Sequence, residues 1–166
     1  MNKDILFEGL IDAYKGYYNI KRENVTEPFD AEGYLSNEAE QYFLVKAAKI
    51  AFVNSYEHVF FKKYGRITFE ELVSLDAAAW ETGIARVKPD ADHKNTDVAL
   101  IVVSDVVTQD IRDRIDSFKH SRNYMLGFHG FSNYRLVVIE APSKTVLTNR
   151  RGRDLRDFVT SVMSKL

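Results

Sequence analysis

The spacing of apolar residues predicts five amphipathic helices. In each segment apolar side chains recur every three or four residues, which places them on one face of a helix. Two of these helices begin with capping-box pairs, Asn37 with Glu40 and Thr68 with Glu71, in which each side chain accepts a hydrogen bond from the other residue's backbone N–H. The five predicted helices cover Asp4–Tyr18, Glu38–Phe52, Phe69–Ile84, Thr108–Phe118 and Arg153–Leu166.

The remaining apolar segments are shorter and predict about five strands. Val98–Val103 is a continuous apolar run rich in β-branched residues, which is typical of a central strand covered on both faces. Tyr and Phe enrichment predicts a strand over Ser55–Tyr64. Turn residues divide the last third of the chain into a β-meander of Asn123–Phe128, Tyr134–Glu140 and Thr145–Thr148. Asn19–Leu35 shows no clear period and is predicted to be a long connection.

This order of elements predicts an α+β fold in a single domain over residues 1–166. Helical connections followed by a meander favour a mixed sheet with helices packed on it over a doubly wound parallel sheet. Residues 1–36 form a helix and the long connection, and residues 37–166 form the core. We expect about five strands and about five helices, with the segment Val98–Val103 beside at least one strand of the meander.

Composition and charge narrow the classes of function. The 166 residues carry 23 basic and 24 acidic side chains, so any basic surface for an anionic partner has to be local. The chain has no cysteine, which excludes disulfides, thiolate metal sites and a cysteine nucleophile. No apolar run is long enough to cross a bilayer, and the amphipathic N-terminal segment is unlike a signal peptide. The sequence predicts a cytoplasmic location and no membrane partner.

The segment Asn149–Arg153 is the strongest candidate for a binding site. Asn149, Arg150, Arg151 and Arg153 surround Gly152 where the last helix is predicted to begin. Unpaired N–H groups and a partial positive charge at a helix N-terminus suit a phosphate or carboxylate, and arginine suits the same anions. The alternative is structural: Asn149 caps the helix, Gly152 makes a turn, and the arginines are solvated or pair with Asp154 and Asp157.

A second candidate is a divalent-metal site built on His93 and His129. These histidines lie in predicted loops, and Asp97 or Asp105 near the ends of the central strand can complete the ligand set of a hydrolase. Both histidines can equally be ordinary loop residues. The acid-rich motif of restriction-type nucleases is absent, because neither Glu57 nor Glu140 has a lysine two residues later.

Three groups of short motifs are distinctive when they are taken together. They are Lys88-Pro89 with His93, Tyr124–Phe131 with Arg135-Leu136, and Thr148–Arg150 with Gly152-Arg153. With these motifs the chain resembles a family of small uncharacterised domains from Gram-positive, clostridia-like bacteria. The resemblance covers roughly residues 38–160, and Phe131 stands where that family often has tryptophan. It implies a bacterial, intracellular, single domain and no assigned activity.

The sequence therefore favours a non-enzymatic binding or interaction domain with an anion-binding corner at Asn149–Arg153. The alternative is a metal-dependent hydrolase or nuclease-like enzyme that uses His93 and His129. We expect no cofactor, and a partner that is either a phosphate-bearing ligand or a protein. We also expect some of the aromatic residues of the first helix to form an exposed apolar patch through which a homodimer would form. The candidates are Phe7, Tyr14, Tyr17 and Tyr18.

Overall fold

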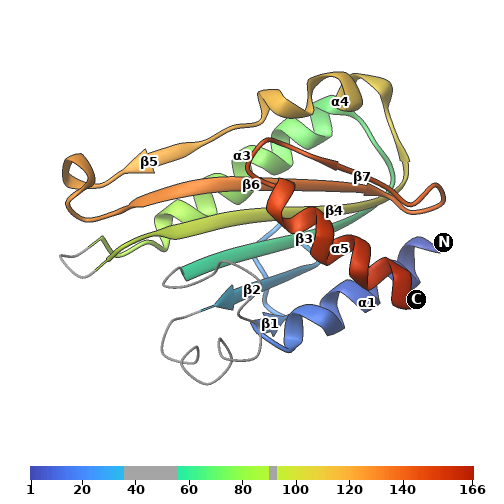
Figure 1. Cartoon of the computed structure of the whole chain (residues 1–166), viewed down its shortest axis with the longest axis horizontal. Helices are drawn as coiled ribbons and strands as arrows, with labels where there is room; N and C mark the ends of the chain where they lie inside the picture. The colour runs from blue at the N-terminus through green and yellow to red at the C-terminus, as the bar shows by residue number, and fades with distance from the viewer. Residues whose placement is uncertain (36–55, 90–92) are drawn as a thin grey trace.

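A computed structural model describes residues 1–35, 56–89 and 93–166 and shows one mixed seven-stranded sheet with helices on both faces (Figure 1). The predicted helix Glu38–Phe52, with its cap Asn37, lies outside the described residues. The helices are α1 (Lys3–Lys15), α3 (Phe69–Ala85), α4 (Gln109–Arg114) and α5 (Arg153–Lys165). The strands are β1 (Asn19–Lys21), β2 (Ala31–Leu35), β3 (Tyr56–Ile67), β4 (Thr96–Val107), β5 (Ser121–Asn123), β6 (Phe131–Glu140) and β7 (Thr145–Thr148).

The centre of the sheet is parallel and its margins are antiparallel. Strand order is β1-β2-β3-β4-β6-β5, with β3, β4 and β6 parallel to one another. β7 pairs with a different stretch of β6 from the one that pairs with β5. The prediction for Val98–Val103 is confirmed: all six residues are fully buried in β4, between β3 and the meander strand β6.

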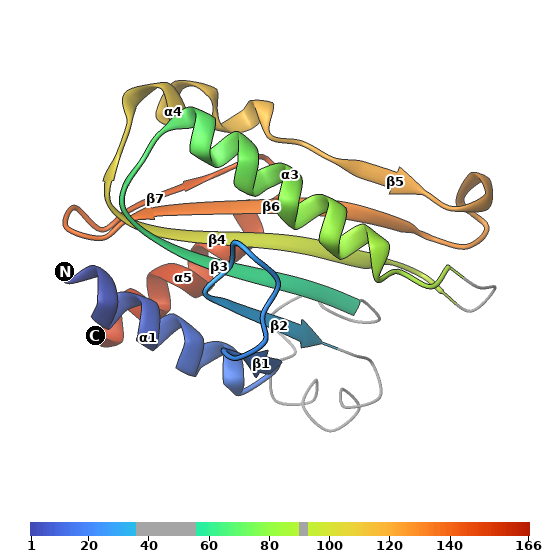
Figure 2. The same ribbon diagram turned by 180° about the vertical axis from the view of Figure 1, so that it is seen from behind.

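Alternation along the strands divides the core into two layers. In β3, Val59 and Phe61 contact α1 and α5 on one face, while Phe60 packs with α3 on the other. Figures 1 and 2 show α5 and α3 on opposite sides of the sheet, with α4 beside α3. Residues of α1 belong to the same core layer as those of α5. The predicted capping box of α3 is confirmed, since Thr68 and Glu71 bond reciprocally. No helix of the described residues is long and apolar enough to cross a membrane.

The sheet is larger than predicted. The structure has seven strands instead of about five. Four of the five predicted helices fall in the described residues, and all four are present. The segment Asn19–Leu35 is not an unstructured connection, because β1 and β2 lie in it as an antiparallel pair. Each of these strands has at most five residues, and a stretch that short carries too few residues to show a hydrophobic period.

One further sequence prediction is wrong. Asn123–Phe128 is not a strand: β5 ends at Asn123, and the chain then turns through a 3₁₀ segment, η3 (Met125–Gly127). Alternating Tyr124 and Phe128 imitate strand periodicity, but Phe128 is 84% exposed. Of the four aromatic residues considered for an exposed patch on the first helix, Phe7 and Tyr14 are buried in the core, whereas Tyr17 is 46% exposed.

Candidate functional site

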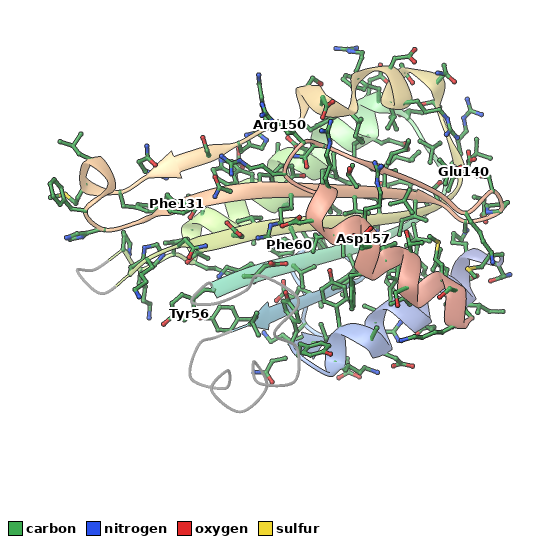
Figure 3. The ribbon with its side chains drawn as sticks, in the orientation of Figure 1. Tyr56, Phe60, Phe131, Glu140, Arg150 and Asp157 are labelled. Carbon is green, nitrogen blue, oxygen red and sulfur yellow. The ribbon has the colours of Figure 1, made fainter. Side chains whose placement is uncertain are left out.

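One cleft in the described part of the chain brings charged residues from three elements together. It has a volume of about 350 Å³ and is lined by Asp97, Asn133, Arg135, Arg150, Arg151, Arg153 and Asp154. We call it the arginine cleft. Asp97 lies at the start of β4, Arg135 in β6, and Arg150–Asp154 in the turn and first residues of α5. Figure 3 shows Arg150 at the turn that leads from β7 into α5.

The register of the parallel strands accounts for the floor of the cleft. Glu57 of β3 lies directly opposite Asp97 of β4, and Arg135 of β6 lies opposite Ala99, two residues further along. These residues have the same parity as Val59 and therefore point to the α1–α5 face. The sheet thus carries two acids and one arginine on neighbouring strands, next to the apolar layer of that face.

Arg135 is the centre of a buried ion cluster. Its guanidinium lies 3.0 Å from Glu57 and 2.6 Å from Asp97, and its Nε lies 3.5 Å from Asp154. The side chains of Arg135, Glu57 and Asp97 are only 11%, 2% and 5% exposed. A buried charge is tolerated only when it is paired, and here the three carboxylates share one cation.

Burial shifts the acids of this cluster toward their protonated forms. Burial raises the pKa of Glu57 to about 7, with Asp97 adding to the rise and Arg135 opposing it. Burial likewise raises the pKa of Asp97 above its ordinary value, again against the attraction of Arg135. Glu57 therefore changes charge near neutral pH directly beneath the cleft.

Asn149 has a structural role in this corner. Its side-chain oxygen accepts hydrogen bonds from the N–H groups of Leu136 and Gly152, at 3.0 Å and 2.8 Å. Its amide group donates to the carbonyls of Phe118 and Tyr134. Both amide hydrogens are therefore used, and Asn149 is 2% exposed, so its side chain has no donor left for a ligand.

The three arginines of the corner differ from Asn149, because they are exposed. Arg150 and Arg151 form no ion pair with any residue in the described ranges, and Arg153 lies 3.6 Å from an exposed Asp116. Asp154 pairs with Arg135 instead of with these arginines. Gly152 precedes α5 without a side-chain acceptor, so the first turn of the helix keeps its partial positive charge facing this corner.

The histidines lie elsewhere. His93 is buried, and its Nδ1 donates to the carbonyl of His129 at 2.6 Å while its Nε2 bonds to the Thr96 hydroxyl at 2.8 Å. His129 contacts the carbonyl of Pro89 through Nδ1. Neither ring lines the arginine cleft, and the described residues contain no group of three potential metal ligands. A metal site on His93 and His129 stays a prediction without a supporting contact.

A family described as a domain of unknown function, DUF8052, matches residues 2–161. The chain belongs to the DUF8052 family. No curated protein and no solved structure matches it. The resemblance to a family without assigned activity is therefore confirmed, and it covers more of the chain than the 38–160 expected from its motifs. The bacterial origin stays a prediction.

Sequence reasoning did not find two pairings in this DUF8052 domain. The first is the Glu57–Arg135–Asp97 cluster, whose signal is a charged residue at an inward-facing strand position. The second lies on the α3 face, where His120 Nε2 is 2.6 Å from the buried Asp76. The His120 ring also stacks on Trp80, with centroids 5.1 Å apart. A polar residue at a helix position facing the core, such as Asp76, is the signal for it.

Proposed function

We propose that this DUF8052 domain is a binding domain whose arginine cleft holds a phosphate-bearing anion. Four arginines and two aspartates line the cleft, so positive charge is in excess there. Arg135 is neutralised by buried acids, whereas Arg150 and Arg151 have no ion-pair partner among the described residues. This difference is the observation that carries the proposal: one arginine holds the cleft together, and the outer ones remain available.

The anion would bind between the outer arginines and the first turn of α5. Guanidinium groups bind phosphate oxygens bidentately, and backbone N–H groups at a helix N-terminus bind the same oxygens. The carboxylates of Asp97 and Asp154 repel an anion that lies deep in the cleft. The phosphate of the ligand would therefore stay at the rim. The carboxylate oxygens are acceptors for a hydroxyl or amino group of the same ligand.

A titration with inorganic phosphate, a nucleotide and a short RNA tests this proposal. We expect Arg150→Ala with Arg151→Ala to weaken binding by at least about tenfold, since a charge-assisted hydrogen bond contributes about 1.5–3 kcal/mol. Calorimetry measures the affinity, and thermal unfolding reports whether the fold is intact. The matched control is Arg66→Ala, an exposed arginine at the other end of β3, which should leave affinity unchanged.

Two results would contradict the proposal. One is wild-type protein that binds none of the three probes. The other is a double variant that loses thermal stability while its affinity stays the same, which would make the corner purely structural. The alternative of a metal-dependent hydrolase on His93 and His129, a cytoplasmic location and a homodimer remain predictions from the sequence.

A further inference from the structure

The loop between β5 and β6, together with the first residue of β6, exposes four large apolar side chains. Met125 is 68% exposed, Leu126 96%, Phe128 84% and Phe131 45%. We call these four residues the hydrophobic tip. Figures 1 and 2 show this loop at one end of the sheet, extending beyond α3, and Figure 3 shows Phe131 at the start of β6. Contiguous apolar exposure of this kind marks a surface that binds something.

The tip is held in place by the backbone around it. The N–H groups of Gly127 and His129 donate to the carbonyl of Tyr124, and the N–H of Tyr124 donates to the carbonyl of Gly130. The N–H of Phe131 donates to the carbonyl of Lys94. A side chain at Gly130 would meet this same carbonyl at 1.9 Å, so the position requires glycine. The exposure of the apolar side chains therefore follows from the fold.

The backbone conformation of the tip does not favour large apolar residues. Met125 and Leu126 have φ angles of 47° and 57°, a region in which glycine and asparagine are favoured over large apolar residues. Neither side chain is buried against the rest of the chain. Large apolar residues at exposed positions with a disfavoured backbone conformation indicate that these side chains contact a partner and not the rest of this chain.

The flanks of the tip carry positive charge. Lys119 and Arg122 precede it, and Lys94 lies next to Phe131 through the backbone contact described above; all three are exposed. The sequence contains no Asp or Glu between Ser117 and Ile139. Asp90 and Asp92 lie outside the described residues. An apolar tip with basic flanks complements a target that has a negatively charged outer layer over an apolar interior.

We propose that the hydrophobic tip inserts into the interface of an anionic lipid bilayer. The four side chains of this protruding tip are far fewer than the roughly 20–30 residues that each partner gives to a stable protein interface. Lipid, by contrast, surrounds a protruding tip on all sides. The internal hydrogen bonds of Tyr124, Gly127 and His129 also satisfy backbone groups that an apolar medium cannot.

This inference is independent of the arginine cleft, and it departs from the sequence prediction of no membrane partner. That prediction rested on the absence of an apolar run long enough to span a bilayer. Insertion at the interface needs no such run, because only the tip enters the headgroup region.

Flotation with lipid vesicles tests the proposal. The full-length protein is mixed with vesicles of phosphatidylcholine alone or of phosphatidylcholine with phosphatidylserine. We expect binding to the anionic vesicles that weakens with added salt, and weaker binding to the neutral ones. Leu126→Asn with Phe128→Ser should lower the partition coefficient by more than about tenfold. Asparagine suits the positive φ at position 126, so this variant keeps its fold.

The matched control is Val73→Gln, which removes an exposed apolar residue from α3 and should leave vesicle binding unchanged. Arg122→Gln should weaken binding to the anionic vesicles only. Wild-type protein that stays with the aqueous fraction for both vesicle types would overturn the proposal and leave a protein partner as the ligand of the tip. Equal binding by wild type and the Leu126→Asn/Phe128→Ser variant would overturn it as well.

Discussion

Asn149 connects three parts of the chain through one side chain. Its four hydrogen bonds reach the backbone of Leu136 and Tyr134 in β6, of Phe118 before β5, and of Gly152 before α5. Gly152 is tied to the same geometry, since an added Cβ would lie 2.4 Å from the Leu136 carbonyl oxygen. Asn149 and Gly152 therefore fix the conformation of the corner that presents the arginines. The arginine side chains are not needed to hold it.

Replacing Asn149 by aspartate should destabilise the domain severely. The change keeps the accepting oxygen but removes the donor, which leaves the carbonyls of Phe118 and Tyr134 facing a carboxylate in a buried position. We expect a loss of about 3 kcal/mol in the free energy of unfolding. Urea unfolding measures it, with the exposed Asn123→Asp as control. An unchanged urea midpoint would show that these bonds contribute nothing.

The residues of the ion cluster could be predicted individually but not as a group. Glu57 stands in register with Val59 and Phe61 along an alternating strand, which already predicts that its side chain points inward. Its contact with Arg135 depends on how β3, β4 and β6 align, and local periodicity does not contain that alignment. The arginines at 150–153 were found from the sequence because they are contiguous.

Elements with strong local signals were predicted well, and edge elements were not. β4 is buried on both faces, so its continuous apolar run was sufficient to predict a central strand. α3 combines a capping box with a helical period, and α5 begins at the predicted residue Arg153. β1, β2 and β5 have three to five residues each and exist because of their long-range partners. No pattern within the segment itself identifies such strands.

The two threonines that precede α3 and α4 provide a matched pair of variants for testing a helix cap. The hydroxyl of Thr68 accepts a hydrogen bond from the N–H of Glu71, whereas the hydroxyl of Thr108, which precedes α4, makes none. We expect Thr68→Ala to lower the free energy of unfolding by about 1 kcal/mol. Thr108→Ala should cost less, because an unpaired buried hydroxyl is removed. Urea denaturation of both variants measures this, and equal losses would contradict the assignment of the cap.

At the scale of the whole molecule, the buried ion cluster connects the sheet with the helix that closes the chain. Arg135 contacts acids from β3, from β4 and from the start of α5. These strands are far apart in the sequence, so the cluster forms only when the domain is assembled. Its charge state therefore couples the stability of the complete fold to pH.

Glu57 should make the domain less stable as pH rises through neutrality. Its pKa is about 7 in the folded protein and has an ordinary value of 4.5, so the folded state holds this proton more tightly than the unfolded chain. The resulting stabilisation is complete below about pH 4.5 and is lost as pH passes about 7, with a total of about 3 kcal/mol. His58 has the opposite effect, because burial lowers its pKa to about 4 and its contribution is lost as pH falls below 6.5.

The two groups act in opposite directions just above neutral pH. Between about pH 6.5 and about pH 8 loss of the Glu57 proton lowers the wild-type free energy of unfolding by about 0.8 kcal/mol, and His58 raises it by about 0.4 kcal/mol, so we expect a net fall of about 0.4 kcal/mol. Glu57→Gln removes the falling contribution and should turn this fall into a small rise, while the exposed Glu81→Gln should keep the wild-type slope. Urea unfolding at several pH values measures all three proteins. If Glu57→Gln retained the wild-type slope, the proton would belong to another group, and the cluster around Arg135 would stay ionised throughout.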